Sequence, residues 1–76
     1  MYPVEISGWE KGFNKVAHTK ALQEFCKLGL GDAKARTDAV LDGAIVLVGV
    51  ETQDRAEELV ARLIKMGAIA RVKRES

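Results

Sequence analysis

Three short segments of the chain have hydrophobic patterns that are typical of β-strands. Residues 3–7 alternate apolar and polar side chains, with Pro3 at the start, where a strand tolerates proline. Residues 44–48 are rich in β-branched side chains and lie in a short segment bounded by glycines. Residues 68–73 follow a glycine that ends a helical segment. We therefore predict strands at these three positions.

Three other segments space their apolar residues as amphipathic helices do. The first runs from residue 15 to about 27, and Asn14 before it can act as the capping residue. The second covers residues 32–41. The third begins after Thr52, a second capping residue, and ends at Gly67.

The order of these elements, β-α-α-β-α-β, predicts an α+β fold. Its architecture would be a two-layer sandwich, with three helices packed on one face of a three-stranded sheet. The 76 residues have a mass of 8.3 kDa, so we expect one domain over residues 1–76 with a small interior. Binding at the surface is therefore the better hypothesis than a deep enclosed pocket.

The predicted strand at 44–48 is apolar on both faces of the sheet. Ile45 and Leu47 would point to one side, and Val46, Val48 and Val50 to the other. A sheet with an apolar outer face is typical of an interface, so we expect a homodimer through this face. The predicted interface residues are Val46, Leu47, Val48 and Ile69. The alternative is that Trp9 folds back and covers the face within one chain.

The exposed surface of the first two helices is both basic and apolar. In the first helix the core-facing arc holds Ala17, Ala21, Leu22, Phe25 and Cys26. The opposite arc holds Thr19, Lys20, Gln23, Glu24 and Lys27, together with the aliphatic Val16. Such a mixed surface suits an acidic protein partner or the phosphate backbone of a nucleic acid. An ordinary solvated helix face is the alternative, and it leaves Val16 unexplained.

Few residues in the sequence could support catalysis or bind a metal. His18 and Cys26 lie eight residues apart on one predicted helix, an axial distance of about 12 Å, so they cannot act as a base and nucleophile pair. A structural zinc site needs four such ligands. Gly29-Leu30-Gly31 follows a helix, and Lys34 stands where a dinucleotide-binding motif needs its third glycine. We predict no enzyme activity, no catalytic residue, no metal and no cofactor. Cys26 is expected in the core, and His18 as a half-buried residue bonded to backbone or to a neighbouring chain.

Charge is almost balanced overall but uneven along the chain. Twelve basic and eleven acidic residues give a formal net charge of +1. Residues 1–36 have six basic and four acidic side chains, whereas residues 37–66 have three and six. An anionic partner should therefore prefer the first half of the chain and the basic end. The longest apolar run, Gly43–Val50, is too short for a membrane helix, and no signal peptide is evident, so we expect a cytoplasmic location without membrane contact.

Several motifs in the first half of the chain occur together: Asn14-Lys15-Val16-Ala17, Lys20-Ala21 and the unbroken run Leu28–Lys34. Gly49-Val50, Ala56-Glu57 and Gly67-Ala68 continue the pattern. With these motifs, residues 4–73 resemble the C-terminal domain of the bacterial large-subunit ribosomal stalk protein. The protease adaptor that recognises N-terminal degrons shares that fold, but the chain has little of its sequence.

The resemblance implies the same β-α-α-β-α-β sandwich, with the first two helices recruiting translational GTPases. Matched residue by residue, this role would fall on Lys15, Val16, Lys20, Gly29, Leu30, Asp32 and Lys34, with Thr19 and Gln23 as departures on the same face. The family's N-terminal dimerisation domain and hinge have no counterpart in the sequence. We therefore expect a stand-alone domain with a changed role, because a shared fold does not by itself transfer function.

The sequence thus predicts a non-enzymatic, homodimeric binding module that presents its basic and apolar helical face to a protein partner. The alternative is a small DNA- or RNA-binding protein. Its contacts would come from Lys15, Lys20, Lys27, Lys34, Arg36, Arg71, Lys73 and Arg74. No aromatic side chains are placed to stack on bases, so this binding would depend on phosphates and weaken with salt.

Overall fold

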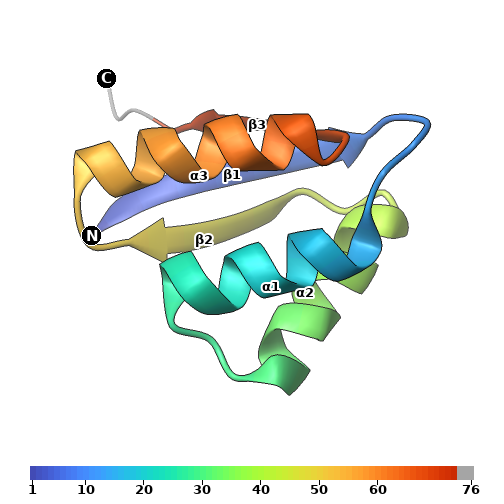
Figure 1. Cartoon of the computed structure of the whole chain (residues 1–76), viewed down its shortest axis with the longest axis horizontal. Coiled ribbons are helices and arrows are strands. Elements are labelled where there is room, and N and C mark those ends of the chain that lie inside the picture. The colour runs from blue at the N-terminus through green and yellow to red at the C-terminus, as the bar shows by residue number, and fades with distance from the viewer. Residues whose placement is uncertain (74–76) are drawn as a thin grey trace.

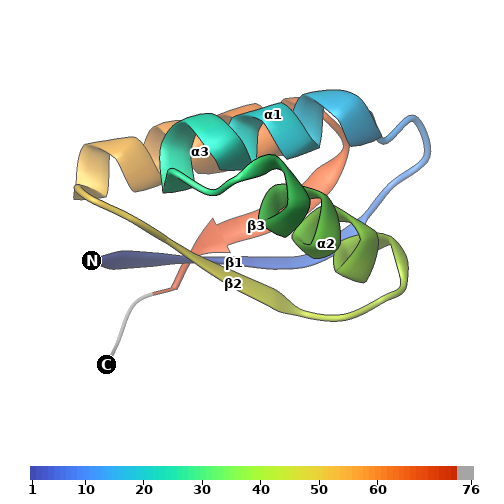
Figure 2. The same ribbon diagram turned by 90° about the horizontal axis from the view of Figure 1, so that it is seen from below.

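A computed structural model describes residues 1–73 of the chain, and three helices and three strands lie within this part. In chain order they are β1 (Tyr2–Trp9), α1 (Lys15–Cys26), α2 (Leu30–Leu41), β2 (Val46–Val50), α3 (Gln53–Lys65) and β3 (Ala68–Val72). The strands form an antiparallel sheet in the order β2-β1-β3, with the helices gathered on one side (Figures 1 and 2). The predicted α+β fold is confirmed. None of the helices within residues 1–73 is long and apolar enough to cross a bilayer.

The ends of the helices follow from local side-chain and glycine chemistry. The Asn14 side chain accepts the N–H of Ala17 at 3.0 Å, and the Thr52 hydroxyl accepts the N–H of Arg55 at 3.1 Å. Both caps were predicted from the sequence. α2 begins two residues earlier than expected, at Leu30, so Asp32 remains in its first turn, where a carboxylate complements the helix dipole.

A β-bulge in β1 decides which way Trp9 points. Ile6 is opposite Ala70 but Gly8 is opposite Ile69, so Ser7 is an extra residue in the β1–β3 ladder. Trp9 is therefore opposite the buried Ala68, and its indole N–H donates to the carbonyl of Leu41 at 3.2 Å, at the end of α2. Trp9 lies on the helical side and does not cover the outer face of the sheet.

The outer face of the sheet carries an ion pair beside its exposed apolar residues. Leu47 on β2 and Ile69 on β3 are about half exposed, as the sequence predicted. Beside them, Glu5 on β1 pairs with Arg71 on β3, whose Nε donates to the Glu5 carboxylate at 2.9 Å. This hydrogen bond from Arg71 lowers the pKa of Glu5. An ion pair therefore adjoins the apolar residues of this face.

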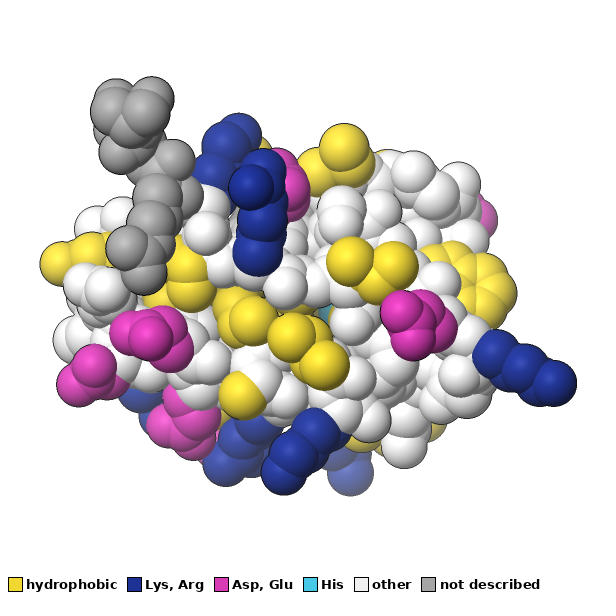
Figure 3. Space-filling model, turned by 90° about the horizontal axis from the view of Figure 1, so that it is seen from above, with side chains coloured by type: hydrophobic (Ala, Val, Ile, Leu, Met, Phe, Trp, Pro, Cys, Tyr) yellow, Lys and Arg dark blue, Asp and Glu magenta, His cyan; other side chains and the backbone are white. Residues whose placement is uncertain are grey.

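Seen from the side of α3 and β3, hydrophobic side chains form a band across the middle of the molecule, with charged side chains above and below it (Figure 3). On this side the described part of the sheet ends at β3, because β3 pairs only with β1 among residues 1–73.

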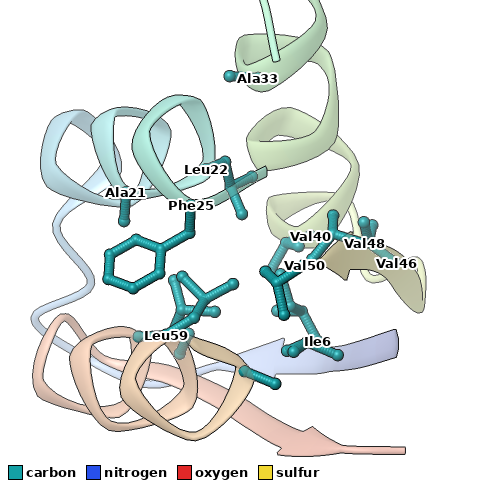
Figure 4. Packing of buried hydrophobic residues seen from close by; sticks show 14 residues of the cluster. Ile6, Ala21, Leu22, Phe25, Ala33, Val40, Val46, Val48, Val50 and Leu59 are labelled. Atoms are coloured by element: carbon teal, nitrogen blue, oxygen red, sulfur yellow. The ribbon is translucent and has the colours of Figure 1, made fainter. Parts of the chain in front are cut away.

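The core fills the space between the sheet and the helices (Figure 4). β1 and β2 contribute alternate side chains, and α1 and α3 cover them with large residues. Buried members include Val4, Ile6, Leu22, Phe25, Val40, Val50, Leu59 and Leu63. Val46 and Val48 also belong here, with only 9% and 6% of their surface exposed. Their placement in an outer-face interface was wrong, because alternation along β2 turns them toward the helices and leaves Leu47 on the opposite face.

Candidate partner-binding groove

α1 and α2 meet at a shallow, mainly apolar groove of about 160 Å³. Residues from one side of α1 and from the start of α2 line it: Lys15, Val16, Thr19, Lys20, Gln23, Leu30 and Lys34. All seven are among the nine residues predicted to contact a partner. The other two, Gly29 and Asp32, are exposed nearby but do not line the groove. The fold thus brings together most of the predicted surface.

The apolar part of the groove comes from two exposed aliphatic side chains. Val16 and Leu30 each leave more than half of their surface in contact with solvent, although neither contributes to the core. Val16 lies on α1 and Leu30 begins α2, so the two reach the groove from different helices. This arrangement accounts for the aliphatic residue that sequence analysis found in the polar arc of the first helix.

The basic residues around the groove differ in their ion pairing. Lys15 lies 3.1 Å from the carboxylate of Asp38 on α2, and both side chains are more than half exposed. Lys20 and Lys34 form no ion pair with any of residues 1–73. Two lysines at the groove are therefore available to an acidic partner, and the exposed Lys15–Asp38 pair contributes little to stability.

The remaining basic residues of the nucleic-acid hypothesis do not extend this surface. Lys27 pairs with Glu51, and Arg36 lines a separate hollow with Cys26. Arg71 is held by Glu5 on the outer face of the sheet, and Lys73 follows at the end of β3. Arg74 lies outside the described residues. The seven described residues of this set are thus dispersed over several sides of the domain.

Thr19 lies beneath the groove and ties α1 to α2. Only 6% of its surface is exposed, so its expected place on the polar arc was wrong. Its hydroxyl is 3.0 Å from the carbonyl of Lys15 and 3.0 Å from Oγ1 of Thr37 on α2. Thr37 is in turn 2.8 Å from Nδ1 of His18. More of the circumference of α1 is buried than packing against the sheet alone would bury, because this helix also packs against α2.

Counting protons gives the direction of these buried hydrogen bonds. The Thr19 hydroxyl donates its one proton to the Lys15 carbonyl, so the Thr37 hydroxyl can donate to Thr19. Nδ1–H of His18 then donates to Thr37. This arrangement satisfies every polar hydrogen in the network, which we call the His18 relay. It leaves Nε2 of His18 as an acceptor with no partner among the described residues.

His18 is fully buried rather than half-buried, and it is bonded to a side chain rather than to backbone. Its ring centroid is 5.0 Å from that of Phe13. Burial lowers the pKa of His18 to about 4, so the imidazole is neutral near pH 7. The adjacent polar pair His18-Thr19 was the signal in the sequence, but Thr37, nineteen positions away, could not be matched to it without the fold.

Cys26 is half-buried beside a second hollow between the helices and β2. Burial raises the pKa of its thiol, so the more reactive thiolate form is disfavoured. Among residues 1–73, no group of three or more His, Cys, Asp or Glu side chains could hold a metal ion. The arrangement of Cys26 fits a packing role.

The structure therefore defines a small α+β domain with a lysine-rimmed apolar groove between its first two helices. No protein-family model matches the chain, and no curated protein matches it either. The resemblance to the ribosomal stalk domain stays a prediction based on its sequence motifs.

Proposed function

We propose that the chain is a non-enzymatic binding module whose groove takes an apolar side chain from an acidic segment of a protein partner. The observation on which this rests is that Val16 and Leu30 stay exposed in the groove beside Lys20 and Lys34. Protein interfaces commonly combine an apolar centre with a polar rim, and a few central anchors supply most of the affinity. The rim lysines would favour acidic partners and speed their association.

The stalk-like motifs suggest the first partner to test. By resemblance alone, the groove residues match the surface that recruits translational GTPases, so such a GTPase is the leading candidate. The homodimer predicted from the sequence belongs to the same proposal, since two copies would present two grooves and raise the avidity for a repeated partner.

Nucleic-acid binding is the second candidate, and Lys20 and Lys34 are the observation that favours it. Such binding would depend on phosphate contacts and would weaken by orders of magnitude between roughly 50 and 200 mM salt if several lysines took part. The dispersal of the other basic residues and the aliphatic groove favour a protein partner.

The test is an amide chemical-shift titration of isotope-labelled protein with a bacterial translational GTPase and, separately, with a short DNA duplex. We expect the GTPase to shift amides of residues 15–34. The variant Lys20→Glu/Lys34→Glu should weaken binding at least tenfold, whereas Lys65→Glu on α3 should leave it unchanged. Equal binding by both variants would refute the proposed surface. Shifts that occur only with DNA, and only at low salt, would favour the second candidate.

A further inference from the structure

Among residues 1–73, β3 is an edge strand whose outer side has unpaired backbone groups. The N–H of Lys73 donates to the carbonyl of Pro3 on β1 at 2.9 Å. Peptide groups alternate sides along a strand, so those of Val72 and Ala70 point away from β1 and toward the free edge. β3 contains no proline, and its one charged residue, Arg71, is turned to the outer face by Glu5. The edge thus lacks a proline and an inward-pointing charge, two of the features that commonly prevent strand pairing.

Two apolar side chains of α3, Val60 and Ile64, lie four residues apart on one side of the helix. Val60 is half-buried and Ile64 is 55% exposed. Ala70 and Val72 of β3 are also only half-buried. These four residues, which we call the β3 edge surface, belong to α3 and β3, and a band of hydrophobic side chains crosses the molecule on the side of these two elements (Figure 3).

We propose that the β3 edge surface pairs with the same surface of a second copy of this chain. A two-fold axis through Ala70 would align the two β3 strands antiparallel and place Val72 of each opposite Ala68 of the other. The same axis suits α3. Ala70 lies about 7 Å along β3 from Ala68, the first residue of the strand. The same distance back along α3 from its last residue, Lys65, corresponds to between four and five residues, so the axis passes near Ala61. One symmetry operation therefore joins both strands and both helices, giving a six-stranded sheet.

Charges at the ends of the paired strands are complementary. With Ala70 on the axis, Lys73 of one copy comes opposite Gly67 of the other. The N–H of Glu10 donates to the carbonyl of Gly67 at 2.7 Å, so Glu10 lies on the side of Gly67 that faces β1, and the long Lys73 side chain of the second copy would reach it across this glycine. Neither Glu10 nor Lys73 forms an ion pair with any of residues 1–73. The dimer would form two Glu10–Lys73 pairs, one at each end.

The β3 edge surface accounts for a dimer better than the outer face of the sheet does. On the outer face, Glu5 lies directly between Leu47 and Arg71, and Ile69 is two residues from Arg71 on β3, so a dimer through this face would have to cover the Glu5–Arg71 pair. The edge surface has no such central charge. It also lies away from α1 and α2, so the groove stays open in the dimer (Figure 1). The inference does not rest on the proposed function of the groove.

Sedimentation velocity over a range of protein concentrations tests the association. We expect the mass to rise from 8.3 kDa toward twice that value. Ile64→Lys should weaken the dimer at least tenfold. The matched control is Ile45→Lys, near the start of β2, because Ile45 is 66% exposed and lies far from the β3 edge surface. A mass of one chain at all concentrations, or an equal effect of both variants, would overturn the proposal.

A charge exchange tests the register independently of any loss of apolar surface. Glu10→Lys and Lys73→Glu should each weaken self-association, since each variant places like charges together. An equimolar mixture of the two should form heterodimers at least as well as the native chain, because every pair is then opposite in sign. Association that is restored in the mixture supports the Ala70-centred register, and a mixture no better than the single variants refutes it.

Discussion

Acidification from pH 7 to pH 5 is expected to lower the free energy of unfolding by about 2 kcal/mol through His18 alone. The pKa of His18 is about 4 in the folded protein, against about 6.5 in an unfolded chain. Between these values the unfolded state binds more protons, so stability falls as the pH falls through 6.5. The loss stops growing below pH 4, at about 3 kcal/mol in total, since each unit of pKa difference corresponds to about 1.4 kcal/mol.

The physical cause lies in the His18 relay. His18 is fully buried, its Nδ1 is already engaged with Thr37, and no carboxylate of residues 1–73 pairs with the imidazole. A proton added at Nε2 would create a buried charge and an N–H donor without a partner among the described residues. For a 76-residue domain, whose total stability is on the order of 5 kcal/mol, this is a large fraction.

Urea unfolding followed by circular dichroism at pH 8, 7, 6 and 5 measures the effect. His18 is the only histidine in the chain, and Glu5 and Glu51, whose pKa values are lowered by their ion-pair partners, titrate below this range. His18→Gln removes the titrating group while keeping an amide that can donate to Thr37, so its stability should be lower at pH 7 but flat down to pH 5. Native protein with equal stability at pH 8 and pH 5, or a variant with the same slope as the native protein, would refute the reasoning.

Two further substitutions test the packing between the elements. In thermal unfolding, Gly67→Ala should destabilise the fold by about 1–3 kcal/mol, because φ is +92° there and the new Cβ would lie 2.9 Å from Cα of Phe13. In the same assay Gly31→Ala should stabilise α2 by about 0.5 kcal/mol, because its Cβ meets no atom within 4 Å. Thr37→Val should cost about 1–3 kcal/mol in urea unfolding, because it leaves Nδ1–H of His18 without an acceptor, while Thr37→Ser keeps the hydroxyl and should lose less. Equal losses for Val and Ser would argue against the hydrogen-bond explanation.

The sequence predicted the elements well because their ends depend on local chemistry. Asn14 and Thr52 cap helices through side chains three residues from the amides they accept, and such short-range contacts are readable in the sequence. Gly43 and Gly67 adopt the positive φ that ends a helical segment. Alternation along β2 also placed Val46 and Val48 correctly on one face of the sheet and Leu47 on the other. Which face is buried depends on where the helices pack, and the strand itself does not show that.

The residues that were misplaced depend on contacts distant in the sequence. The side on which Trp9 lies follows from the bulge at Ser7, which no turn or proline marks in the sequence. The burial of His18 and Thr19 follows from α2, which packs against the flank of α1 that a helical wheel assigns partly to solvent. The groove residues could be predicted to lie together on the surface, because an aliphatic side chain among lysines is unusual on a solvent-exposed helix face, whatever packs beside that helix.

The His18 relay connects the stability of the fold with the shape of the groove. Thr19 lines the groove and also accepts the hydrogen bond that begins at His18, so the groove wall and the buried imidazole belong to one network. Protonation at Nε2 keeps the hydrogen bond from Nδ1–H to Thr37 but buries a charge, and it therefore favours the unfolded chain. A partner that binds only the folded chain would favour the neutral imidazole. By linkage it would then oppose protonation of His18, and protonation would weaken binding by the same factor. Acid sensitivity of the fold and of partner binding should therefore have a common origin in one buried side chain.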